Sequence, residues 1–195
     1  GLIDASITVC DGAGNVITEN PNLVQGIGAR LTGIIKTFPI RETIEYIEKN
    51  GGIILDKEKA TIDPYKAFKK AVEMKYRKIA ISITGYDADK ISLIRRECAK
   101  NNVKAYIFIV CNTGVSKENA EKMLYADLVW ASASKYVREI VGPKAILQLG
   151  LSIPVFILSK DGKKLVLNHL KYIDYPLIIH RIKPPYLEKG PEPLI

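Results

Sequence analysis

Two segments of the chain combine a thiol, a carboxylate or amide, and small residues directly after an apolar run. They are "VCDGAG", which begins at Val9, and "VCNTG", which begins at Val110. If both runs are strands of one parallel sheet, their carboxyl ends lie at one edge, where helix N-termini also direct free N–H groups. This pattern predicts a cleft for an anionic small molecule. The candidate ligand-binding residues are Cys10, Asp11, Gly12, Gly14, Gly26, Gly28, Arg30, Thr84, Gly85, Cys111, Asn112, Thr113, Gly114, Ser132 and Ser134.

The thiols of Cys10 and Cys111 offer a second chemistry at the same edge. Either one is a candidate nucleophile or metal ligand if the two lie close together or beside a cation that favours the thiolate. Each is also a normal small apolar strand residue. The chain has 3 cysteines and 2 histidines, with no CxxC pair, no HExxH motif and no arrangement typical of a catalytic triad. Whether the protein is an enzyme therefore stays open, and no cofactor is indicated.

The glycines near the N-terminus do not form a nucleotide-binding motif. Counting from Gly12 or from Gly26, the third glycine of a GxGxxG fingerprint is missing, and no Walker A sequence follows. Gly12 and Gly14 instead predict a tight turn or short hairpin after the first strand. Gly26 and Gly28 fall inside a predicted helix that starts at Asn20-Pro21, where each costs about 1 kcal/mol relative to alanine. Either close packing or a ligand explains them, with Arg30 as an anion partner.

The polar residues after the strands also have ordinary structural explanations. Asp87, Asp89, Ser116 and Ser134 are of the types that cap helix N-termini. Thr84-Gly85 and Asn112-Thr113-Gly114 are normal turn sequences as well as candidate anion-binding loops.

The elements that must position these residues alternate between β-branched apolar runs and segments of helical period. This alternation predicts an α/β fold with a mainly parallel sheet and crossover helices on both faces. We expect one domain over residues 1–175, a proline-rich extended tail over 176–195, and a missing N-terminal portion. The expected strands are Leu2–Cys10, Ile53–Leu55, Lys78–Thr84, Val103–Cys111, Leu128–Ala131 and Pro154–Leu158.

Helices are predicted where apolar residues recur at spacings of three and four. Asp63 and Pro64 begin one of them, Pro39 precedes another that stops at Gly51-Gly52, and a third that follows Asp87–Asp89 buries Cys98. Shorter helices follow Ser116 and Ser134. The segment "SKDGKKLVLNHLKYI" fits a helix or a hairpin, and we favour the helix.

The charge and the cysteine content limit the class of protein. The net charge of +8 is spread in short groups, with no basic run of five and no interleaved aromatics, so nucleic acid is a poor candidate partner. Anionic small molecules suit the charge equally well. The longest apolar runs are too short to cross a membrane, and free thiols favour a cytoplasmic location.

Two long segments resemble a known family. They are "GLIDASITVCDGAGNVITENPNLVQGIGARLTGIIKTFPI" and "VCNTGVSKENAEKMLYADLVWASASKYVREIVGPKAILQLGLSIPVFILS", and they resemble the methanogenesis marker protein 8 family of methanogenic archaea up to about Ser159. The resemblance implies a cytoplasmic protein of methane-producing organisms, associated with methyl-coenzyme M reductase and its supporting machinery. It supplies no reaction and no catalytic residues. We expect an accessory protein that binds an anionic small molecule; the alternatives are an enzyme that uses Cys10 or Cys111, and an assembly factor that docks through its proline-rich tail.

Overall fold

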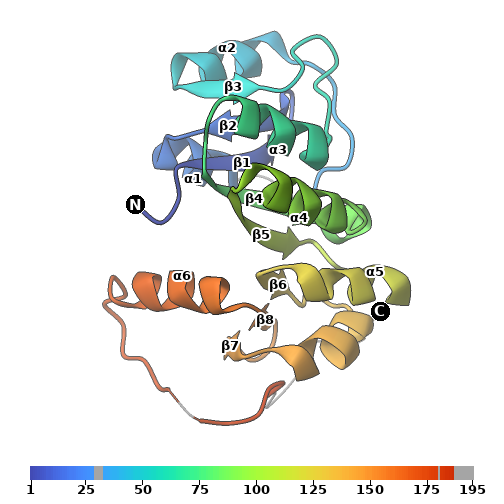
Figure 1. Ribbon diagram of the computed structural model, residues 1–195, viewed down its shortest axis with the longest axis vertical. Coiled ribbons are helices and arrows are strands. Elements are labelled where there is room, and N and C mark those ends of the chain that lie inside the picture. Colours follow the sequence, from blue (N-terminus) through green and yellow to red (C-terminus); the bar gives the residue numbers. More distant parts are fainter. Residues whose placement is uncertain (29–32, 180, 187–195) are drawn as a thin grey trace.

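The computed structural model describes residues 1–28, 33–179 and 181–186. In this part of the chain, a single sheet has the strand order β3-β2-β1-β4-β5-β6-β8-β7, from top to bottom in Figure 1. The strands are β1 Ala5–Cys10, β2 Gly14–Thr18, β3 Gly52–Ile54, β4 Lys78–Thr84, β5 Lys104–Val110, β6 Leu128–Trp130, β7 Leu147–Leu149 and β8 Val155–Ile157.

The sheet is parallel in its middle and antiparallel at both sides. β1, β4, β5 and β6 pair in parallel, whereas β2 and β3 on one side and β8 and β7 on the other pair antiparallel. The predicted α/β class is confirmed, but the sheet is mixed rather than mainly parallel. The difference arises because antiparallel strands are added beside β1 on one side and beside β6 on the other. Of these added strands, β7 was not expected.

The predicted turn after the first strand is a hairpin. Cys10 pairs with Gly14 across the antiparallel β1–β2 ladder, and the N–H of Ala13 donates to the carbonyl of Cys10 at 3.2 Å. Gly12 and Gly14 adopt φ angles of +81° and +71°, which L side chains rarely adopt. Gly14 is also close to backbone, because a Cβ on it would lie 2.4 Å from the carbonyl carbon of Ala60. Glycine is required here on both grounds.

The helices begin at polar residues, largely as expected. Asp63, Ser116 and Ser159 each accept a hydrogen bond from a backbone N–H three residues further on. The helices are α1 Pro21–Gly28, α2 Arg41–Lys49, α3 Pro64–Glu73, α4 Lys90–Asn101, α5 Lys117–Lys122 and α6 Lys160–Leu170. Ser134 likewise accepts from the N–H of Val137, at the start of a π-helical turn, Val137–Val141. α6 confirms the helix that was favoured for "SKDGKKLVLNHLKYI".

Asp87 and Asp89 do not cap a helix, contrary to expectation. Asp89 precedes α4 but already has helical backbone angles, φ −60° and ψ −28°, whereas a capping residue needs an extended backbone. Its carboxylate pairs with Lys90 instead, and the Asp87 carboxylate accepts a hydrogen bond from the Thr84 hydroxyl. Burial raises the pKa of Asp87.

Alternate residues of the strands belong to two hydrophobic clusters on opposite faces of the sheet. In β2, Ile17 joins the main core with α3, α4 and α5, whereas Val16 joins a smaller cluster with α1 and α2. A third cluster, Leu128, Ile157 and Val166, packs α6 against β6 and β8. α4 and α5, which connect the parallel strands β4, β5 and β6, both contribute to the main core cluster (Figure 1).

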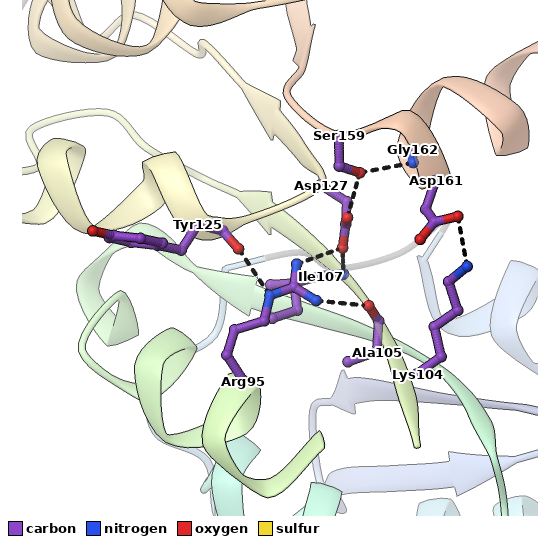
Figure 2. A network of polar contacts seen from close by, with 9 residues as sticks. All are labelled: Arg95, Lys104, Ala105, Ile107, Tyr125, Asp127, Ser159, Asp161 and Gly162. Atoms are coloured by element: carbon purple, nitrogen blue, oxygen red, sulfur yellow. Dashed lines mark hydrogen bonds and ion pairs between the residues drawn. The ribbon is translucent and has the colours of Figure 1, made fainter. Parts of the chain in front are cut away.

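A buried carboxylate connects α4, β5, β6 and α6 (Figure 2). One Asp127 oxygen accepts from the N–H of Ile107 at 2.7 Å and from the Arg95 guanidinium at 2.8 Å. The other accepts from the Ser159 hydroxyl at 2.5 Å, and Ser159 in turn accepts from the N–H of Gly162. Arg95 also donates to the carbonyls of Ala105 and Tyr125. The dashed contacts around Asp127 in Figure 2 thus hold these elements together.

Beyond α6 the described residues form no helix or strand. The segment returns to the sheet at Tyr186, whose N–H donates to the Gln148 side chain of β7 at 2.8 Å. Between these points large apolar side chains face solvent, with Tyr175 82% and Ile178 84% exposed. None of the helices that the structure describes has the length and apolar character needed to cross a membrane.

Candidate functional site

A pocket of about 610 Å³ lies between α1, α2 and the carboxyl end of β1. We call it the α1–α2 pocket. Its lining combines the end of β1, one face of each helix, and three amide side chains: Cys10, Asp11, Asn20, Asn22, Leu23, Gly26, Ile27, Ile40, Glu42, Thr43, Tyr46, Ile47 and Asn50. Of the residues singled out from the sequence, the pocket brings together Cys10, Asp11 and Gly26.

Local hydrogen bonds fix the distance between the two helices. The side-chain oxygen of Asn20 accepts from the N–H groups of Asn22 and Leu23, which starts α1 immediately before Pro21. The amide nitrogen of Asn20 donates to the carbonyl of Asn50, just after α2, at 3.0 Å. The start of α1 is thereby tied to the end of α2.

The two glycines of α1 have no packing role within the described chain. Leu23 and Ile27, four residues apart, bury the inner face of the helix, while Gly26 and Gly28 are exposed. A Cβ on either glycine would meet no atom within 4 Å. Close packing against the described residues therefore does not explain this pair, and Gly26 leaves its side of the pocket open to them.

The Asp11 end of the pocket is held by a loop that precedes α2. The Thr37 hydroxyl donates to the Asp11 carboxylate, and its oxygen accepts from the N–H of Gly12 at 2.9 Å. The N–H of Ile40 donates to the carbonyl of Gly12, also at 2.9 Å. A Cβ on Gly12 would lie 2.9 Å from the Ile40 Cβ. Gly12 therefore allows this loop to reach the hairpin.

The same loop passes over the carboxyl ends of the central strands. Its beginning lies against the end of β5, because a Cβ on Gly33 would be 2.6 Å from Cys111, and its end is bonded to the β1–β2 hairpin at Gly12. Residues 33–40 therefore bridge the edge at which the sequence predicted an open cleft.

Cys10 and Cys111 do not meet. β4 lies between their strands, so their backbones are two strand spacings apart, roughly 10 Å, beyond the reach of a disulfide. Cys111 has a φ of +58°, in the left-handed region. Within the described ranges no group of three His, Cys, Asp or Glu side chains is placed to hold a metal ion. Cys98 lies on α4 as expected, and burial raises the pKa of its thiol.

The polar residues after β5 and β6 join these two strand ends to each other. Asn112 is fully buried; its N–H donates to the Ser132 hydroxyl at 3.1 Å, and its side-chain amide donates to the carbonyl of Trp130 at 2.5 Å. The N–H of Ala133 donates to the Thr113 hydroxyl at 3.4 Å. The backbone and side-chain N–H groups of Asn112 are thus used within the chain, while the expectation that this edge binds an anion stays a prediction.

Three further candidates from the sequence have structural roles at this edge. Gly85 is needed because a Cβ there would lie 2.2 Å from the side-chain oxygen of Asn112, and Gly114 has a φ of +74°. Thr84 donates to Asp87, as described above. Arg30 lies outside the described residues, so its expected role as an anion partner stays a prediction.

Sequence reasoning missed a buried arginine that fixes the loop after β6. Arg138 is 5% exposed and donates to the carbonyls of Ser132 and Ser152 at 2.9 and 2.8 Å. Burial lowers the pKa of its guanidinium. It also missed the α2 side of the pocket, although Glu42, Tyr46 and Asn50 recur at spacings of four, which is the only local signal they carry.

The fold and this site can now be compared with known proteins. Residues 1–171 match the family model described as "Uncharacterized protein conserved in archaea (DUF2099)". The chain belongs to the DUF2099 family. A protein from Methanocaldococcus jannaschii, "Uncharacterized protein MJ0054", is similar to the chain, with 42% identity over 194 residues, which are 99% of this chain and 67% of the relative. No solved structure matches the chain significantly. The pocket lies within the part that the family model covers.

Proposed function

We propose that this DUF2099 protein binds a small molecule in the α1–α2 pocket. The proposal rests on the position of Gly26. Glycine destabilises a helix by about 1 kcal/mol relative to alanine, and the space left by its missing side chain lies in the pocket. The volume of about 610 Å³ is within the range of small-molecule sites. The lining also has the usual composition of such sites, with apolar walls and a few polar groups.

The site differs in place and in charge from the one expected at the strand ends. The ends of β5 and β6 are internally hydrogen bonded, so the pocket beside β1 is the better candidate. The ionised side chains among its described lining residues are Asp11 and Glu42, which do not favour the anionic ligand that the net charge suggested. Cys10 lies in the lining, so a thiol reaction at this site stays an alternative prediction.

A substitution that fills the pocket tests the proposal. We would titrate the protein with N-phenyl-1-naphthylamine, an uncharged probe that fluoresces in apolar surroundings. Gly26→Leu places a side chain in the pocket and adds a better helix former, so it should weaken probe binding about tenfold or more while the fold is kept.

Gly28→Leu is the matched control. Gly28 is exposed on the same helix, has the same open surroundings, and does not line the pocket. This variant should bind the probe like the unchanged protein, and thermal melting followed by circular dichroism should show both variants folded. Equal affinity of Gly26→Leu and the unchanged protein would refute the pocket as the binding site.

We further propose that this binding serves methanogenic metabolism. The relative from Methanocaldococcus jannaschii is consistent with a methanogen origin, and the resemblance to methanogenesis marker protein 8 supports the same assignment. Replacing the chromosomal gene of a methanogen by its Gly26→Leu form tests it. Slower growth on methanogenic substrates with the Gly26→Leu form but not with the Gly28→Leu form supports the role, and equal growth of both contradicts it.

The exposed C-terminal segment favours a second candidate function, docking onto a methanogenesis enzyme. Monomeric proteins seldom expose several large apolar side chains together, and Ile178 and Ile179 are 84% and 78% exposed. Ile178→Ser combined with Ile179→Ser should abolish co-purification with methyl-coenzyme M reductase components. Co-purification that survives both substitutions rejects this function.

A further inference from the structure

The α1–α2 pocket carries two carboxylates although the protein as a whole has a net charge of +8. Asp11 and Glu42 stand at its lining, and none of the lining residues in the described part of the chain is a lysine or an arginine. We propose that the pocket selects an organic cation, an amine joined to an apolar body. This inference rests on the proposed function, because it specifies the ligand of the same pocket.

Asp11 is held in a fixed position at one end of the pocket. The Thr37 hydroxyl donates to its Oδ1, and Thr37 is itself oriented by accepting from the N–H of Gly12. No residue in the described ranges donates a hydrogen bond to Oδ2. With respect to the described residues, this oxygen therefore keeps its lone pairs for a further donor, such as the ammonium group of a ligand.

Glu42 differs from the other glutamates of α2 in having no ion-pair partner among the described residues. Glu45 pairs with Arg41, and Glu48 pairs with Lys57, whereas the Glu42 carboxylate remains unpaired in the pocket lining. An uncompensated carboxylate attracts a cationic ligand more strongly than one that already has a counter-ion.

Tyr46 adds an aromatic ring next to this carboxylate. Residues four apart are neighbours on one helix face, so Glu42 and Tyr46 lie side by side in the lining. A carboxylate beside a ring face is a suitable environment for an amine, because the ring quadrupole also attracts a cation.

The rest of the lining determines what the cation is attached to. Leu23, Ile27 and Ile47 are buried and form apolar wall, which favours a hydrocarbon body. Two carboxylates beside an apolar wall suit an amphipathic amine.

Three compounds with one body and different charges test the inference. We would displace N-phenyl-1-naphthylamine from the protein with 4-phenylbutylamine, 4-phenylbutanol and 4-phenylbutyrate. Two exposed carboxylates attract the amine and repel the acid, so the amine should displace the probe at a concentration about tenfold lower than the acid, with the alcohol between them. In the protein with Asp11→Asn and Glu42→Gln together, the three values should converge to within about threefold. Raising the salt concentration should narrow the difference in the unchanged protein.

Glu45→Gln is the control, since it removes one charge from the same helix outside the pocket lining and should leave the tenfold preference unchanged. Equal displacement by all three compounds, or stronger displacement by the acid, overturns the selection of a cation while leaving the pocket intact. Failure of the probe to respond to Gly26→Leu refutes the proposed function itself, so the two failures are distinguishable.

Discussion

Removing the buried carboxylate of Asp127 should destabilise the protein by about 3 kcal/mol. Asp127→Ala leaves the N–H of Ile107 without the acceptor that it now has at 2.7 Å in the buried interior, and a stranded buried donor costs about 1–3 kcal/mol. Arg95 also loses its ion pair. Its side chain is 33% exposed, so water screens the loss and we add only about 1 kcal/mol. The Ser159 hydroxyl keeps its bond from Gly162 and adds little.

Urea unfolding followed by circular dichroism measures this difference. For a chain of this size, about 3 kcal/mol corresponds to a fall in Tm of roughly 6 to 12 °C. Asp161→Ala is the matched control, because Asp161 makes only the partly exposed ion pair with Lys104 at 2.5 Å (Figure 2) and its loss should cost less than about 1 kcal/mol. An Asp127→Ala variant that unfolds at the same urea concentration as Asp161→Ala would refute the role assigned to this network.

Three further changes have expected outcomes. Gly26→Ala should stabilise the protein by about 1 kcal/mol in urea unfolding, because its Cβ enters open space. Gly52→Ala should destabilise it, because its Cβ would lie 2.4 Å from Ile47. A loss of stability at position 26 would contradict the open surroundings of Gly26. Burial raises the pKa of Asp87, so the folded state binds its proton more tightly than the unfolded chain, and the protein gains stability as pH falls through the raised pKa. Asp87→Asn should therefore be more stable than the unchanged protein at neutral pH and lose that advantage towards pH 3.8. A stability difference that stays constant across pH would contradict the raised pKa. Because burial also raises the pKa of Cys98, its thiol should react with 4,4′-dithiodipyridine more slowly than the thiol of Cys10, which lines the pocket. Mass spectrometry of the labelled peptides measures both rates. Faster labelling of Cys98 would contradict the burial.

The local pattern of the sequence was sufficient to predict most elements but not their neighbours. β4 was expected with the observed bounds, and the cap at Asp63 was recognised, because side-chain periodicity and capping chemistry act over a few residues. β7 was missed because Leu147–Leu149 holds no β-branched residue, unlike the equally short β3, β6 and β8. The antiparallel pairing at both sides of the sheet depends on how loops return, which no local pattern records.

The candidate site was harder to predict, because a polar residue has the same chemistry whether it binds a ligand or its own chain. Asn112 and Ser132 were reasonable ligand-binding candidates, yet they bond to each other's strand ends. Gly26 was singled out on an energetic ground that remains valid, its cost inside a helix. The sequence could not show that Tyr46 lines the same pocket as Gly26, since that requires the packing of α1 beside α2.

The loop over residues 33–40 explains why the pocket lies beside the parallel strands rather than at their ends. It contacts Cys111 through Gly33 and is bonded to Gly12 near its other end, so it covers the edge where β4 ends between them. With that edge covered and the ends of β5 and β6 bonded to each other, the open approach to the end of β1 is from the side, between α1 and α2. The loop also supplies Thr37, which orients Asp11. One segment therefore both covers the expected site and shapes the observed pocket.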